Sequence, residues 1–133
     1  MVYTYFRGFN KAWIQNQPDV YEVSWNEYNK TPLKAFILEE STYEGKHETW
    51  GSALQVRKQV YWTVLGGGIG NAYGSPLWRC DSNWRRNLDL PGALSLKHFH
   101  HLSSGLQWEK LIPDTNKAIS VAGNGDFVTK QLC

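Results

Sequence analysis

The chain alternates short apolar segments with longer segments of helical pattern, and this alternation restricts its fold more than any other feature. The segments rich in β-branched, aromatic or small apolar residues, which predict strands, are 2–6, 35–38 and 69–74. The segments with helical periodicity or helix-flanking residues, which predict helices, are 20–29, 53–65 and 91–104. Strands and helices in this order imply parallel strands with right-handed crossovers. We therefore expect an α/β fold, either as a small unit or as part of a larger barrel.

Residues that commonly flank helices support the predicted boundaries. Asp19 and Ser52 are good N-cap residues for the first two helices. Pro91 suits the first turn of the third, and Gly105 its end. The residues expected to share one face are Tyr21, Trp25 and Tyr28 in the first helix, and Ala53, Val56, Val60 and Val64 in the second.

The pattern changes from residue 117 onward. Two extended segments, 118–122 and 127–129, flank a Gly-Asn-Gly-Asp turn, which predicts a hairpin. We therefore expect one α/β unit over residues 1–116, and over residues 117–133 either a terminal hairpin or the start of a truncated β domain.

Charge and hydropathy argue against two classes of partner. The net charge of the 133-residue chain is only +2 and no basic run is present, so we expect no nucleic-acid partner. No apolar run approaches the roughly 20 residues that span a bilayer, so we expect no membrane partner.

Three motifs that can mark cofactor or metal sites lack the necessary context. Gly66-Gly67-Gly68 follows a predicted helix, whereas a phosphate-binding loop follows a strand and opens a helix. Cys80 and Cys133 have neither CxxC nor Cys/His spacing. The histidines of His98-Phe99-His100-His101 have no Cys, Asp or Glu at ligand spacing beside them. We expect no metal site and no cofactor.

Aromatic residues make up 14% of the chain, with seven Trp, seven Tyr and five Phe. Aromatic side chains dominate the energetics of protein cores, and their faces also stack on the apolar face of sugar rings. The excess alone favours the core, but Tyr73, near the end of a predicted strand, and Trp78, in the loop after it, are also suited to a sugar pocket. A loop wrapped over the core explains them equally well.

Two consecutive carboxylates, Glu39 and Glu40, follow the apolar segment 35–38. In parallel α/β folds, functional residues collect at the carboxyl ends of the strands. Glycoside hydrolysis needs two carboxylates, one on each side of the sugar bond. Adjacent strand residues point to opposite faces, so these two cannot form that pair. Either one of them is catalytic, or both belong to a solvated loop.

Five ordered segments are similar to motifs of one enzyme family. They are Glu40–Glu44 (ESTYE), Val56–Trp62 (VRKQVYW), Gly70–Gly74 (GNAYG), Leu88–Ala93 (LDLPGA) and Trp108–Asp114 (WEKLIPD). Together they resemble the apiosidase-like glycoside hydrolases, whose barrel is often followed by a small β domain. One departure is Glu39, which stands where the family usually has a small residue.

The resemblance implies a fold and a function. The fold is a partial (β/α)8 TIM-type barrel, about strands six to eight with their helices, running into the start of a β domain. The function is hydrolysis of O-glycosidic bonds in the side chains of plant-type polysaccharides, with a carbohydrate as the partner. The second carboxylate then lies on an earlier strand outside this chain, and complete members are expected to be secreted or periplasmic. The alternative is a carbohydrate-binding or degenerate barrel relative without activity.

The same resemblance implies site residues. Glu40 is the expected catalytic carboxylate, at the motif's first position. The expected substrate-binding residues are Tyr3, Tyr5, Tyr43, Glu44, Tyr73 and Trp78.

Overall fold

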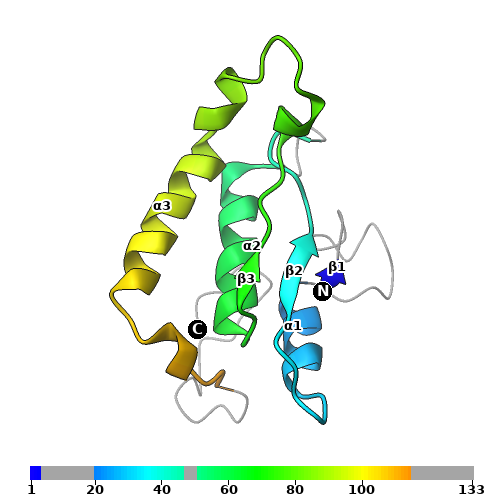
Figure 1. Ribbon diagram of the computed structural model, residues 1–133, viewed down its shortest axis with the longest axis vertical. Helices are drawn as coiled ribbons and strands as arrows, with labels where there is room; N and C mark the ends of the chain where they lie inside the picture. Colours follow the sequence, from blue (N-terminus) through cyan, green and yellow to red (C-terminus); the bar gives the residue numbers. More distant parts are fainter. Residues whose placement is uncertain (4–19, 47–50, 115–133) are drawn as a thin grey trace.

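The computed structural model describes residues 1–3, 20–46 and 51–114 (Figure 1). The strands are β1 (Val2–Tyr3), β2 (Ile37–Glu40) and β3 (Gly70–Asn71). The α-helices are α1 (Val20–Tyr28), α2 (Ala53–Leu65) and α3 (Pro91–Ser104), and the short 3-10 helices are η2 (Pro76–Arg79), η3 (Arg86–Asp89) and η4 (Trp108–Lys110). The strands form one parallel sheet in the order β1-β2-β3. The prediction of an α/β fold with three parallel strands is confirmed.

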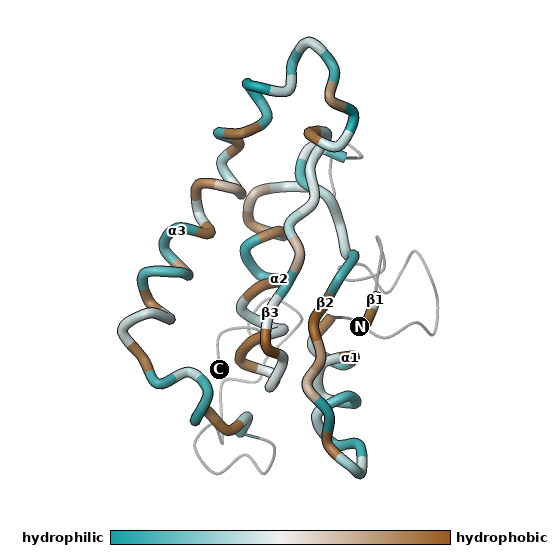
Figure 2. Tube along the Cα trace, in the orientation of Figure 1, coloured by the Kyte–Doolittle hydropathy of each residue, from teal (hydrophilic) through white to brown (hydrophobic). Residues whose placement is uncertain are grey.

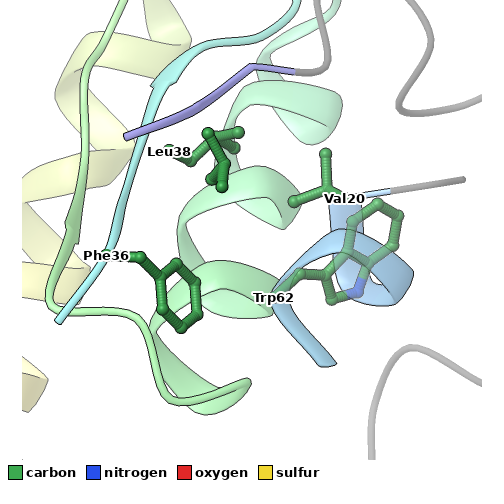
Figure 3. Close-up of a cluster of buried hydrophobic side chains, with 5 residues drawn as sticks. Val20, Phe36, Leu38 and Trp62 are labelled. Carbon is green, nitrogen blue, oxygen red and sulfur yellow. The ribbon is translucent and has the colours of Figure 1, made fainter. Parts of the chain in front are cut away.

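The core lies between the sheet and the helices. Phe36 and Leu38 point from the β2 segment toward α2, and they pack with Val20 of α1 and Trp62 of α2 (Figure 3). Val2 of β1 belongs to the same cluster. Figure 2 shows β2 passing from apolar to polar residues toward its carboxyl end. The sheet therefore turns one face to the helices and presents its carboxylates at one end.

Helix α2 has the predicted bounds, and its start has a local cause. The Ser52 side chain accepts from the backbone N–H of Gln55, and the Gln55 side chain accepts from the backbone N–H of Ser52. This reciprocal capping box satisfies two N–H groups at the helix start. On the buried face, Val56 and Val60 are joined by Gln59, Trp62 and Thr63, which the predicted stripe did not include.

The glycines after α2 provide close packing, as their position after a helix indicates. Gly67 has a φ of +91°, a conformation that favours glycine. A Cβ at Gly68 would lie 2.7 Å from Thr63 Cγ2 and 2.9 Å from the Phe36 ring. The segment ends the helix and lets the backbone approach the core.

The predicted face of the first helix is wrong at Trp25, whose side chain is 44% exposed. The residues of α1 buried instead are Val20 and Ser24. A Cβ at Gly66 would lie only 2.8 Å from Ser24 Cβ, so α1 approaches the end of α2 too closely for a large side chain. Tyr21 and Tyr28 pack against the core as expected.

The helix bounds 91–104 are also confirmed, whereas the strand bounds differ from the predictions. The second strand was predicted at 35–38 but runs from Ile37 through Glu40. The third was predicted at 69–74 but is only Gly70–Asn71, because the following residues turn toward the loop after β2.

Several predictions concern residues outside those described. They are the strand residues 4–6, the N-cap Asp19, the hairpin at 117–129 and Cys133. Cys80, by contrast, is described and is an exposed free thiol. Among the described helices, none is long and apolar enough to cross a membrane.

Candidate active site

Glu40 lies at the carboxyl end of β2, where the sheet register is irregular. Val2 pairs with Leu38, and the next residue, Tyr3, pairs with Glu40, so β2 has one extra residue at this point. An extra residue of this kind interrupts alternation and re-aims the side chain that follows. Since residues in register on parallel strands share a face, we infer that Glu40 lies on the face of Tyr3, opposite Leu38 and the helices.

The Tyr43 hydroxyl donates to Oε1 of Glu40 across 3.0 Å. Glu40 and Tyr43 are both half-buried. The bond fixes one carboxylate oxygen and leaves the other, Oε2, for a further contact. Tyr43 was predicted to bind substrate. The structure brings it to the predicted catalytic carboxylate.

Glu39 has a different environment from Glu40. Its Oε2 atom is buried and has no hydrogen-bond partner among the residues that the structure describes. A buried carboxylate oxygen without a donor is costly. Glu39 stands where the family usually has a small residue. It is also the extra residue of β2, between Leu38, which pairs with Val2, and Glu40, which pairs with Tyr3.

Glu44 is buried, with 4% of its surface exposed, and its carboxylate accepts three hydrogen bonds from residues that the structure describes. The donors are the backbone N–H of Gly92 at 2.6 Å, the backbone N–H of Ala93 at 3.1 Å and the hydroxyl of Tyr73 at 2.8 Å. Gly92 and Ala93 belong to the first turn of α3, whose N-cap residue, Leu90, offers no side-chain acceptor. Glu44 therefore caps α3 from 48 residues away in sequence.

Tyr73 bonds to Glu44 rather than to Glu40. Burial raises the pKa of the Tyr73 hydroxyl well above its usual value, and the hydrogen bond to the Glu44 carboxylate and its charge raise it further. An anion beside a carboxylate is unfavourable, so Tyr73 remains a neutral donor.

The remaining predicted substrate-binding residues differ in exposure. Trp78, on η2, is 66% exposed, with the Arg79 guanidinium 5.6 Å from its ring centre. Tyr3 is 42% exposed. Tyr5 lies outside the described residues.

Sequence reasoning missed two contributors, the backbone N–H groups of Gly92 and Ala93. A signal for them was present. A helix that begins Leu90-Pro91-Gly92 has no capping side chain of its own, so its first N–H groups need an acceptor from elsewhere.

The loop between β3 and α3 contains an open hollow of about 380 Å³. Its lining is mostly polar and consists of Pro76, Asp81, Asn83, Arg86, Asn87 and Leu90. In the described part of the chain, no group of three or more His, Cys, Asp or Glu side chains is placed to hold a metal ion.

The fold and site define an α/β protein of parallel strands, with carboxylates and tyrosines gathered at the strands' carboxyl ends. Comparison with known families then gives a more specific assignment. The family model described as apiosidase-like, catalytic domain, matches residues 1–110, and the chain belongs to this family. No curated protein matches the chain. Membership confirms the resemblance seen in the sequence. It indicates a function related to glycoside hydrolysis and a carbohydrate as the substrate.

Proposed function

We propose that the chain is the carboxyl-terminal part of a (β/α)8 glycoside hydrolase barrel and that Glu40 is one of its two catalytic carboxylates. The substrate class is the O-glycosidic linkage in side chains of plant-type polysaccharides. The observation that carries the proposal is the position of Glu40, at the end of a parallel strand and held by Tyr43, within a family motif.

The sheet supports a barrel. Within the described residues, β1 and β3 each pair with β2 alone, so each has an edge to which a further parallel strand can add. Helices α1 and α2 cover the face to which Phe36 and Leu38 point (Figure 3), as the outer helices of a barrel do. The proposed barrel part is residues 1–116, with residues 117–133 beginning a β domain or hairpin.

In the proposed mechanism Glu40 acts as nucleophile or general base. The second carboxyl group, on an earlier strand, is protonated and donates its proton to the leaving oxygen. A separation of about 5–5.5 Å between the two carboxyl groups gives retention, and one of about 6.5–9.5 Å leaves room for water and gives inversion. The hydrogen bond from Tyr43 holds Oε1 of Glu40 in place, and either role requires a fixed carboxylate.

Exposed aromatic side chains are the proposed sugar contacts. Trp78 offers a largely uncovered ring, and Tyr3 is aligned with Glu40 on the neighbouring strand. Tyr5, Tyr43 and Tyr73 stay predictions as substrate ligands. Glu44 was also predicted as one, but its carboxylate is buried against the start of α3 and we do not propose it as a sugar contact.

The test compares Glu40→Gln with Glu39→Gln in the complete barrel protein. Glu40→Gln keeps the side-chain shape and removes the charge. It should lower kcat by roughly 10²- to 10⁴-fold, typical of a lost proton-transfer group, or by more if Glu40 is the nucleophile. Oligosaccharide binding, measured by calorimetry, should persist in this variant.

Glu39→Gln is the matched control and should keep most of the turnover. Near-normal turnover in Glu40→Gln, together with loss of turnover in Glu39→Gln, would show that Glu39 and not Glu40 is the catalytic carboxylate. A wild-type protein that binds oligosaccharides and never cleaves them would instead support the degenerate, carbohydrate-binding alternative.

A further inference from the structure

We propose that Glu44 is a positioning residue that holds Tyr43, and through it Glu40, by tying the loop after β2 to the start of α3. The catalytic part of this inference rests on the proposed role of Glu40, whereas the structural part does not. Three observations carry it: the contacts of the Glu44 carboxylate, the contact of the Tyr43 ring with Gly74, and the bond from Tyr43 to Glu40.

The Glu44 carboxylate joins two segments remote in sequence. It accepts from Gly92 and Ala93 at the positive end of α3 and from Tyr73 after β3. Removing a carboxylate from water is costly unless donors replace the water, and a helix N-terminus stabilises a negative charge. The buried charge of Glu44 is therefore stable only while these segments stay together.

Glu44 also fixes the backbone beside Tyr43. Its N–H donates to the carbonyl of Gly74 across 2.8 Å. A Cβ at Gly74 would overlap the ring of Tyr43, lying 2.6 Å from Cγ, so the ring packs directly against the glycine backbone. The side chain and backbone of Glu44 together hold Tyr43 against the segment after β3.

This packing sets the direction of the Tyr43 hydroxyl. With the ring held at Gly74, the hydroxyl lies 3.0 Å from Oε1 of Glu40, three residues earlier in the chain. If Glu44 were released from α3, the loop would lose its bond to the helix, and the hydroxyl would lose its fixed position. Glu44 is then required for orientation of Glu40, without itself touching substrate.

The structural test uses the side-chain carboxyl carbon resonance of Glu40 at pH 7. Tyr43→Phe removes the donor and serves as the reference for a lost bond. Glu44→Gln places an amide N–H₂ against donors and should move the Glu40 resonance in the same direction. The double variant should show little change beyond Tyr43→Phe, because residues that act in series are not additive. Glu109→Gln, an exposed change on η4, should move nothing.

If Glu44→Gln fails to fold, Gly92→Ala supplies the same test with residue 44 intact, because its Cβ would overlap the Glu44 carboxylate. A Glu40 resonance that moves in Tyr43→Phe but not in Glu44→Gln or Gly92→Ala overturns the inference. A Glu40 resonance that does not move in Tyr43→Phe overturns the inference as well.

In the complete enzyme, Glu44→Gln should lower kcat about tenfold with little change in KM, as expected for the loss of one hydrogen bond to a charged group. The loss should again not add to that of Tyr43→Phe. An enzyme in which Glu40→Gln is fully active would refute the proposed function, while the carbon resonances would still decide whether Glu44 positions Tyr43.

Discussion

Gly92→Ala adds a single methyl group at the junction between Glu44 and α3. Gly92 is buried at the second residue of the helix, and a Cβ there would lie 2.6 Å from Cδ and 2.9 Å from Oε1 of Glu44. The end of a glutamate side chain can normally swing aside. Here it accepts three hydrogen bonds, so a movement that relieves the overlap stretches or breaks them.

The magnitude follows from two opposed terms. Alanine is favoured over glycine within helices by about 0.8–1 kcal/mol. A hydrogen bond to a charged group contributes about 1.5–3 kcal/mol, and two backbone N–H groups bond to this carboxylate. Because Glu44 is only 4% exposed, water cannot replace them readily. The two bonds outweigh the helix preference, and we expect a net destabilisation of about 2–5 kcal/mol.

Urea unfolding followed by circular dichroism measures this change, and Gly105→Ala is the matched control at the other end of α3. A Cβ at Gly105 would meet its nearest atom, Leu102 O, at an ordinary 3.7 Å, and its φ of −89° suits any residue. The control should be neutral or stabilising by up to about 1 kcal/mol. Equal stability of Gly92→Ala and Gly105→Ala would refute the account of Glu44 as the cap of α3.

Two further predictions concern the core and the response to alkali. Leu38→Ala should destabilise the protein by about 2–5 kcal/mol, since Leu38 is 1% exposed in the core cluster, and a change below 1 kcal/mol in the same urea experiment would contradict this packing. The raised pKa of Tyr73 predicts stability that is fully present below about pH 10, where a tyrosine of the unfolded chain ionises, and that falls as the pH rises further because the unfolded state releases the proton first. Unfolding free energies between about pH 10 and 12 should therefore fall less steeply in Tyr73→Phe, and an identical slope would count against a neutral Tyr73.

The helices most accurately predicted from the sequence are those whose ends are determined locally. Ser52 and Gln55 form a capping box within four residues of chain, and Pro91 and Gly105 mark the two ends of α3. Such signals need no knowledge of the rest of the fold. The buried face of α1 was not predictable in the same way, because it depends on the close approach of Ser24 to Gly66, a contact between separate elements.

The partners of the loop carboxylate also depend on tertiary structure. Tyr73 was predicted to bind substrate, and its hydroxyl donates to Glu44. The backbone N–H of Glu44 donates to the carbonyl of Gly74, the residue after Tyr73, which brings the two side chains together. The sequence shows that Leu90 offers α3 no capping side chain, but not which of the chain's carboxylates fills that place.

The choice between Glu39 and Glu40 depends on one step of sheet register. Strict alternation would group Glu40 with Phe36 and Leu38, the side chains that pack on the helices. The pairing of Tyr3 with Glu40 shows that alternation is interrupted. The extra residue in β2 places Glu40 on the opposite face of the sheet from Leu38. The extra residue is defined only relative to β1, a separate strand, so no pattern within residues 35–40 reveals it. The proposed catalytic position therefore requires both the acidic residue and the neighbouring strand. A variant that alters the pairing of β1 with β2 should therefore displace the Glu40 carboxylate, even when every side chain of the loop after β2 is intact.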